Sequence, residues 1–136
     1  MRCIILGMAT KESEAGPPPK PEAFVAMQEY NEAAVKAGVL LAAEGLTPTS
    51  KGVRVKFNGD QRTVIDGPFT ETKELVAGFW IVQGKSKEEI VERFTHAPFD
   101  GGQVIEIRQV FEAEDFGDDL PPEIRNQEAL LREHAG

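Results

Sequence analysis

The sequence predicts an α+β protein built around one antiparallel β-sheet. Two stretches, residues 2–9 and 75–82, are apolar on both alternating faces, which is typical of central strands covered on both sides. Two others, residues 22–37 and 87–97, space their apolar residues as helices do. All 136 residues fit one domain, and a chain of this length buries enough surface to fold without a disulfide or a metal.

The first part of the chain predicts a strand, a loop and a helix. The strand at residues 2–9 holds the single cysteine, Cys3, which we expect in the core because no histidine is near it in sequence. Residues 11–21 contain a run of three prolines and predict a surface loop rather than a helix. The helix at residues 22–37 presents one stripe of contacts, formed by Phe24, Met27, Tyr30 or Asn31, Ala34 and Ala37.

The middle of the chain predicts a second strand and a β-hairpin. Residues 39–46 form the strand, and Glu44 within it either points inward or lies at the strand end in water. Residues 53–57 alternate apolar and basic side chains, as in a half-exposed strand. The sequence NGD then signals a tight turn, and residues 62–65 return to end at Asp66.

The last part of the core predicts a helix and a strand. Ser86 and Glu89 match a capping box at the start of the helix, which ends before Pro98. Its expected buried residues are Ile90, Val91 and Phe94. The final strand, residues 104–111, has two unlike faces. One face holds Ile105, Ile107 and Phe111, and the other holds Val104, Glu106, Arg108 and Val110.

The order of strands and helices is the split β-α-β pattern of ferredoxin-like folds, with an extra hairpin between the second and third core strands. Its two helices cover one face of the sheet and leave the other face without a cover. Because residues 2–9 and 75–82 are apolar on both faces, that second face would expose a large apolar patch. A second copy, packed sheet against sheet, is the simplest cover. We therefore expect a homodimer with a barrel-like core and a cavity between the sheets or at their edges.

The domain boundary is expected near residue 112. Residues 1–112 form the ferredoxin-like domain, and residues 113–136 form an acidic linker and a C-terminal helix that packs on the dimer. The helix spans residues 123–134, and its expected contacts are Ile124, Ala129, Leu130 and Leu131.

The best place to look for function is the segment DGPFTETKE, residues 66–74, which leads into the strand at residues 75–82. In one interpretation Asp66 is a general base or a ligand anchor at the rim of a cavity. Neighbouring groups that could bind a ligand there are Glu44, Phe69, Glu71, Lys73, Glu106 and Arg108. In the other interpretation the Asp66 carboxylate accepts backbone N–H groups and braces the bend at Gly67 and Pro68.

These residues also carry a resemblance to a known family. The runs DGPF (residues 66–69), TETKE (70–74) and AGFW (77–80) closely resemble the signature of the DGPF group of YCII-related proteins. The runs EGL (44–46) and VIEIR (104–108) are similar to that group as well. The resemblance implies a dimeric α+β barrel on a ferredoxin-like protomer, typically bacterial and of undefined activity.

The resemblance implies several functions without choosing among them. Some members of the wider superfamily are small lyases or dehydrochlorinases that act on cyclic or aromatic compounds, so a cofactor-free lyase or isomerase is the first alternative. Other relatives are encoded near alternative sigma factors, which suggests a ligand-binding or regulatory module, and a purely structural dimer is the third alternative. The wider family has a His–Asp pair, but the only histidines of this chain are His96 and His134, so Asp66 has no clear histidine partner.

Charge, apolar runs and missing motifs argue against several other classes of protein. The net charge of −8 argues against nucleic-acid binding, which usually needs a basic patch. The chain has no apolar run of membrane-spanning length and opens with no signal peptide, so we expect no membrane partner and a cytoplasmic location. We expect no metal and no cofactor, since no cysteine–histidine cluster and no phosphate-binding loop occur.

Overall fold

A computed structural model describes residues 1–99, 101–119 and 121–135 of the chain. Some side chains within these ranges lie outside the description: Lys73, Asp118, Asp119, Arg125, Glu128, Ala129, Arg132, His134 and Ala135.

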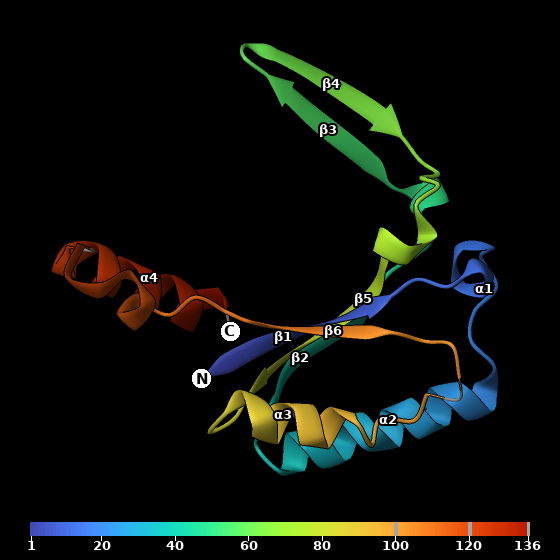
Figure 1. The fold of residues 1–136 in the computed structure, drawn as a ribbon, viewed down its shortest axis with the longest axis horizontal. Helices are drawn as coiled ribbons and strands as arrows, with labels where there is room; N and C mark the ends of the chain where they lie inside the picture. Colours follow the sequence, from blue (N-terminus) through green and yellow to red (C-terminus); the bar gives the residue numbers. More distant parts are fainter. Residues whose placement is uncertain (100, 120, 136) are drawn as a thin grey trace.

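The core is a four-stranded antiparallel sheet with the order β2-β5-β1-β6 (Figure 1). Its strands are β1 (Arg2–Met8), β2 (Leu40–Gly45), β5 (Val76–Gln83) and β6 (Ile105–Gln109). Strands β1 and β5 take the two central positions, as their two apolar faces predict. This order is that of a ferredoxin-like protomer, so the expected α+β class is confirmed.

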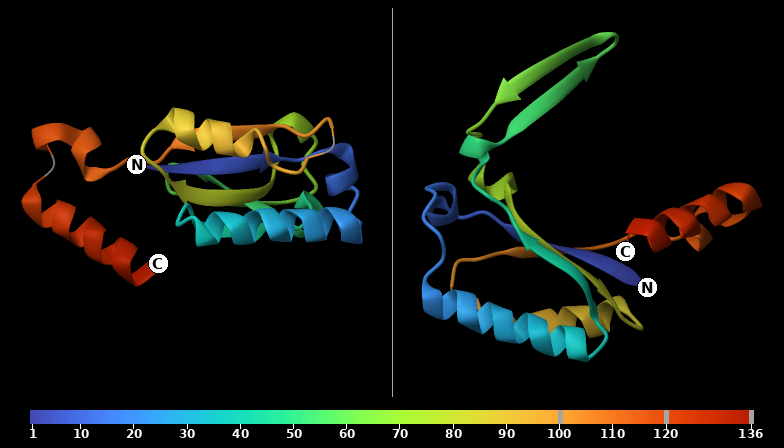
Figure 2. Two further views of the ribbon diagram at one scale, coloured as in Figure 1. Left: turned by 90° about the horizontal axis from the view of Figure 1, so that it is seen from below. Right: turned by 180° about the vertical axis from the view of Figure 1, so that it is seen from behind.

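Two helices, α2 (Pro21–Lys36) and α3 (Lys87–Phe94), lie on the same face of this sheet (Figures 1 and 2). The buried cluster between the sheet and these helices consists of Cys3, Ile5, Trp80, Val82, Ile90 and Phe94. Ser86 caps α3 by accepting the Glu89 N–H at 3.2 Å, as the capping motif predicts. Burial of apolar side chains on the helix stripes and on one sheet face therefore holds the sheet layer and the helix layer together.

Three residues expected in the helix contacts lie at the surface instead. Phe24 is 57% exposed and Val91 is 39% exposed, and Ala37 lies exposed just beyond the end of α2. Both helices rest on a narrow sheet, so only the centre of each predicted stripe reaches the core. The buried or half-buried residues of α2 are Ala26, Met27, Tyr30, Asn31 and Ala34.

The predicted loop at residues 11–21 contains one short helix, α1 (Lys11–Glu14). Thr10 and Ser13 form a reciprocal capping box at its start, which the proline run downstream obscured in the sequence. The expectation of a loop without helix was wrong for this one turn, whereas Gly16 to Lys20 are irregular as expected.

The hairpin strands β3 (Val53–Asn58) and β4 (Gln61–Asp66) form a separate two-stranded sheet, which we call the arm. The arm rises from one end of the core sheet, on the side away from α2 and α3 (Figures 1 and 2). Every residue from Val53 to Asp66 is exposed, so the expectation of half-exposed strands was wrong for the protomer.

The segment after β6 leads away from the sheet. Strand β6 ends at Gln109, so Phe111 is not a core strand residue as expected, but a 69% exposed residue beyond it. The 3₁₀ segment η3 (Ala113–Asp119) and helix α4 (Pro122–Ala135) follow. Among the expected helix contacts, Ile124, Leu130 and Leu131 are exposed, and the Ala129 side chain lies outside the description. The packing of α4 on a dimer stays a prediction.

Candidate functional site

The DGPF turn is held against residues 49–52, which include the 3₁₀ turn η1 (Thr49–Lys51). The Gly67 N–H donates to the Gly52 carbonyl at 2.9 Å, and the Gly67–Pro68 peptide is cis. A Cβ atom on Gly67 would lie 1.7 Å from the Thr49 carbonyl oxygen. The φ angle of Gly67 is not positive, so the reason for glycine at this position is the close backbone approach and not a left-handed backbone conformation.

A short hydrogen-bond chain, which we call the arm-root network, joins α1, η1 and the DGPF turn. The Glu14 carboxylate accepts both the Thr49 N–H at 3.1 Å and the Thr49 hydroxyl at 2.6 Å. The Thr49 hydroxyl oxygen in turn accepts the Phe69 N–H at 3.0 Å. Because two of these three bonds have the charged Glu14 carboxylate as acceptor, the network holds the root of the arm firmly against α1.

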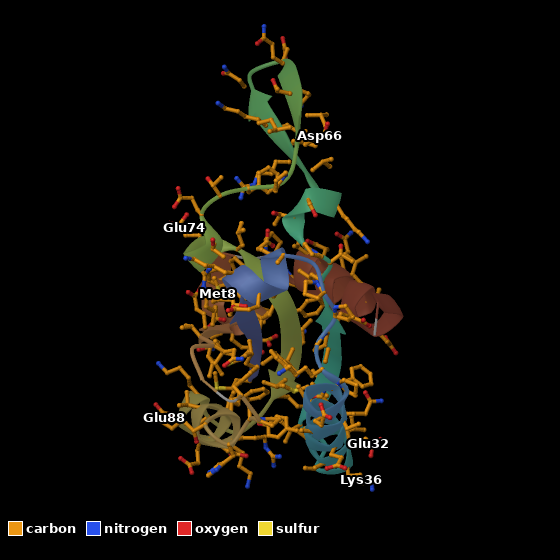
Figure 3. All side chains as sticks on the ribbon, turned by 90° about the vertical axis from the view of Figure 1, so that its right-hand side faces the viewer. Met8, Glu32, Lys36, Asp66, Glu74 and Glu88 are labelled. Carbon is orange, nitrogen blue, oxygen red and sulfur yellow. The ribbon has the colours of Figure 1, made fainter. Side chains whose placement is uncertain are left out.

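Asp66 lies at the end of β4, on the arm, and is exposed (Figure 3). Its carboxylate makes no hydrogen bond with any of the described residues, so the expected brace of the turn by Asp66 was wrong. The bend is braced instead by Thr49, whose hydroxyl oxygen accepts the Phe69 N–H. Asp66 pairs across the hairpin with Val53, and cross-strand partners share a face.

The other residues of the predicted site around the turn have separate positions. Phe69 is half-buried, and the guanidinium carbon of Arg54 lies 3.7 Å from the centre of its ring, a cation–π contact. Glu71 is exposed and precedes the 3₁₀ turn η2 (Thr72–Glu74). Lys73 belongs to η2, and its side chain lies outside the described residues.

Glu44, Glu106 and Arg108 share the face of the core sheet that α2 and α3 leave uncovered, which we call the open face. Glu44 on β2 pairs with Phe79 of β5, while Glu106 and Arg108 on β6 pair with Leu6 and Ile4 of β1. Since Cys3 and Ile5 point into the helix-covered core, their neighbours in β1 point to the open face. The centre of this face is apolar and consists of Ile4, Leu6, Phe79 and Ile81.

The structure therefore divides the predicted site into two groups. One group lies on the open face, where Glu44 and Glu106 stand on opposite edges of the sheet. Three strand spacings separate those edges, about 14 Å. The other group, Asp66, Phe69 and Glu71, lies at the root of the arm. Within one protomer these groups surround the open face and do not converge on one point.

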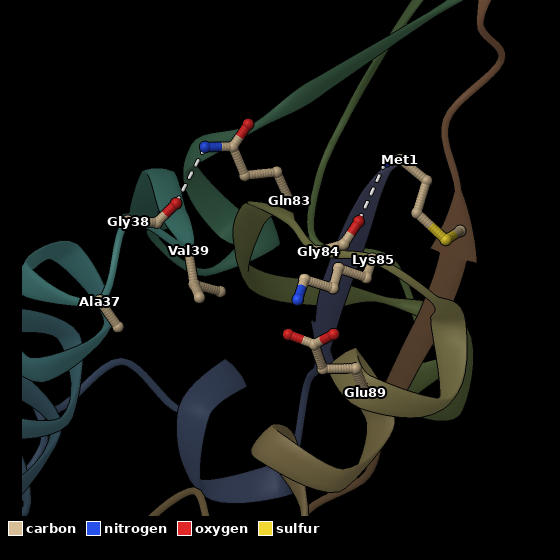
Figure 4. A pocket seen from close by; sticks show the side chains of 8 residues that line it. All are labelled: Met1, Ala37, Gly38, Val39, Gln83, Gly84, Lys85 and Glu89. Carbon is tan, nitrogen blue, oxygen red and sulfur yellow. Dashed lines mark hydrogen bonds between the residues drawn. The ribbon is translucent and has the colours of Figure 1, made fainter.

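Two shallow hollows lie elsewhere on the surface. One, of about 270 Å³, lies where β5 ends, and there the Met1 ammonium group donates to the Gly84 carbonyl at 3.0 Å (Figure 4). The other, of about 440 Å³, runs between α2 and β2 and includes Asn31, whose side-chain oxygen accepts the Trp80 indole N–H at 3.0 Å. Both hollows are wide open, and the described residues that line them include none of the predicted site residues.

Cys3, Trp80, Tyr30 and His96 lie in the core or at the surface, away from the predicted site. Cys3 and Trp80 lie in the core, and burial raises the pKa of the Cys3 thiol. Burial also raises the pKa of Tyr30, whose hydroxyl donates to the Arg93 carbonyl at 2.7 Å. His96 is exposed beyond the end of α3 and pairs with Glu92 at 3.1 Å. The expected core position of Cys3 and the expected contact of Tyr30 with the core are confirmed.

A His–Asp pair is not formed by His96 and Asp66, because α3 and the arm lie on opposite sides of the sheet (Figure 1). His134 lies outside the described side chains. No group of three or more histidine, cysteine, aspartate or glutamate side chains gathers to hold a metal within the part of the chain that the structure describes. The helices of that part are all too short or too polar to span a membrane.

Sequence reasoning missed Glu14 and Thr49, the two side chains that hold the DGPF turn. Glu14 stands before a proline-rich stretch and Thr49 in a turn, and no spacing links either residue to Phe69. The TPT segment, residues 47–49, was the available signal, since threonine often bonds nearby backbone groups, but the partner of Thr49 lies 20 residues away and follows only from the fold.

Comparison with known proteins adds the family. The model of the YCII-related domain matches residues 1–114. A curated, uncharacterised protein of Rhizobium meliloti (strain 1021) is 34% identical to this chain over 58 residues. That match covers 43% of this chain and 47% of the relative, so the chain is aligned with about half of that protein's length.

Proposed function

The chain belongs to the YCII-related domain family, and from its open face we propose that it is a homodimeric protein that binds a small molecule beside the packed sheets. The observation that carries the proposal is the composition of the open face. Four adjacent apolar side chains fill its centre, and Glu44, Glu106 and Arg108 flank them. A sheet face of this kind is suited to packing about 10 Å from an equal face.

The same pattern favours a ligand at the margin of the packed sheets. There an apolar surface lies beside two carboxylates and a guanidinium group. A small cyclic compound with a polar substituent could contact the apolar surface with its ring and the charged groups with its substituent. Asp66, Phe69, Glu71 and Lys73, from the DGPF segment, are the further binding groups of the proposal. A cytoplasmic, bacterial member of the DGPF group is the most consistent setting.

The catalytic form of the proposal is a cofactor-free lyase or isomerase acting on a small cyclic compound. It requires a carboxylate to remove a proton next to a carbonyl, and Asp66 is the candidate base. Asp66 and His96 form no pair, so the geometry supports binding more directly than turnover. Binding without turnover would leave a regulatory module, as in a sigma-factor system, as the function.

The assembly is tested by sedimentation equilibrium at micromolar protein. We expect the wild-type mass to be that of a dimer and Leu6→Lys to give a monomer, because a lysine at the centre of the open face would bury an unpaired charge. The matched control is Phe24→Lys, a lysine on the exposed side of α2, which should leave a dimer. A wild-type monomer, or a dimer unaffected by Leu6→Lys, would refute packing through the open face.

Ligand binding is tested by saturation-transfer NMR with a panel of cyclohexanone, catechol and benzoate. We expect at least one compound to bind the wild type and to bind Glu44→Gln or Arg108→Gln at least tenfold more weakly. One-dimensional spectra of the same samples after a day separate turnover from binding. Binding that these two variants leave unchanged would contradict the proposed site.

A further inference from the structure

One face of the arm is apolar and exposed. Val53, Val55 and Phe57 alternate along β3, and Val55 pairs with Val64 of β4, so all four side chains share a face. Their exposed fractions lie between 47% and 68%. Two-stranded hairpins are marginally stable alone in water, and contiguous exposed apolar patches often mark interaction sites. We therefore expect another protein surface to cover the apolar face of the arm.

The charge of the arm indicates which surface that is. The arm, residues 53–66, holds three basic and two acidic side chains, a net charge of +1. The whole chain carries −8, so the remaining residues carry −9. Arg62 pairs with Phe57 at the tip of the apolar face, and its guanidinium carbon lies 4.6 Å from the Phe57 ring centre. Arg54 and Lys56 lie on the other face of the hairpin, so the positive group of the apolar face is Arg62, and the rest of this same chain supplies the opposite sign.

A surface with complementary properties lies after β6. Phe111 and Phe116 are 69% and 41% exposed, and their ring centres are 5.4 Å apart. Glu114 and Asp115 are exposed between them in sequence. We call these four residues the aromatic–acidic patch. It offers flat apolar area together with negative charge, which matches the valines, Phe57 and Arg62 of the arm.

The arm and the patch lie at opposite ends of the core sheet (Figures 1 and 2). Near the arm root the Ala9 N–H bonds Leu75, and at the other end the Val110 N–H bonds the Arg2 carbonyl. The two surfaces of one protomer therefore do not meet. If two copies stack sheet on sheet, a twofold axis that lies between the sheets and perpendicular to the strands reverses the strand direction from one copy to the other. The arm of each subunit then lies at the same end of the dimer as the patch of the other subunit.

We propose that the arm of each subunit docks its apolar face on the aromatic–acidic patch of a second copy of this chain. The inference rests on the proposed dimer and adds the contact that its open face alone does not provide. Asp66 shares the apolar face of the arm through its pairing with Val53. Docking therefore carries the Asp66 carboxylate into the seam between the subunits, so a binding site that uses Asp66 contains groups from both chains.

The docking is tested by photo-crosslinking in the intact chain. The photoreactive residue p-benzoylphenylalanine replaces Phe57 in one sample and Lys56 in a control, because Lys56 is adjacent but on the other face of the hairpin. Protein that carries the photoreactive residue is mixed with ¹⁵N-enriched protein that lacks it. Mass spectrometry then identifies crosslinks that join one chain of each kind. We expect position 57 to crosslink to residues 111–119 of the other chain at least fivefold more than position 56.

The outcomes separate the two proposals. The docking is overturned, and the dimer is left standing, if the protein sediments as a dimer but position 57 crosslinks within its own chain or to another region of the partner. The same conclusion follows if position 57 crosslinks no more than position 56. A protein that sediments as a monomer overturns both.

A charge swap is the second test. Arg62→Glu and Glu114→Arg should each weaken the dimer about two- to fivefold, and the double variant should regain most of that loss. Additive losses in the double variant would show that the two side chains do not meet and would overturn the docking.

Discussion

Gly67 is the residue whose identity the structure constrains most tightly, because its Cα approaches the Thr49 carbonyl so closely. We predict that Gly67→Ala destabilises the protein by about 3 kcal/mol or displaces the arm, since backbone must move to admit the methyl group. Urea denaturation measures the change. Gly45→Ala is the control, because a Cβ there meets no atom within 4 Å. Equal effects of the two variants would contradict the close-approach argument.

Asp66 is exposed and makes no hydrogen bond with the described residues, so its charge contributes little to the protomer. We predict that Asp66→Asn changes the free energy of unfolding by less than about 0.5 kcal/mol. Its effect should appear in ligand binding, measured with the compounds that bind the wild type. A large loss of stability would assign the carboxylate to an ion pair, and unchanged binding would remove it from the site.

Tyr30 links stability to alkaline pH. Burial raises its pKa, so the fold favours the neutral hydroxyl that donates to Arg93. This contribution is complete below the ordinary tyrosine pKa of about 10 and is lost as the pH rises through the higher value of the folded state. We predict that stability falls above about pH 10 and that Tyr30→Phe, although less stable at neutral pH, falls less steeply. Parallel falls would show that another group, such as Cys3, dominates.

At the scale of elements, the arm-root network decides how the hairpin stands on the core. Thr49→Val keeps the shape of the side chain but leaves the Phe69 N–H and one Glu14 oxygen without their partner. We predict a loss of about 1 to 3 kcal/mol in urea denaturation, together with increased protease cleavage in residues 53–66. Thr49→Ser retains the hydroxyl and should lose much less. A harmless Thr49→Val would mean that other contacts hold the arm.

Some features of the elements follow from their own local sequence, whereas others depend on distant segments. The hairpin follows from local signals, because NGD and the alternating residues around it specify the turn and the pairing. The cap of α3 at Ser86 is equally local. The angle of the arm to the sheet is not local, since Glu14, Thr49 and Phe69 come from three separate segments.

At the scale of the whole molecule, the uncovered surfaces are the open face, the arm and the aromatic–acidic patch. If they are covered by a second copy, folding is coupled to association. We predict that the melting temperature rises with protein concentration over a hundredfold range, by several degrees, because dilution favours separate chains. Differential scanning calorimetry measures it, and Leu6→Lys should abolish the concentration dependence. A constant melting temperature in the wild type would argue against this coupling.

Local patterns in the sequence specified the α+β class, the order of the elements along the chain and the two central strands, because these depend on periodicities of two and of about three and a half residues. They did not specify every core residue, since Phe24, Val91 and Phe111 are exposed. They also indicated that Glu106 and Arg108 share a face of their strand. Only the tertiary structure separated Asp66 from those residues and assigned the turn brace to Thr49. Hydrogen bonds and close backbone contacts between distant segments decide such positions, and no residue pattern within one segment records which distant partner it will meet.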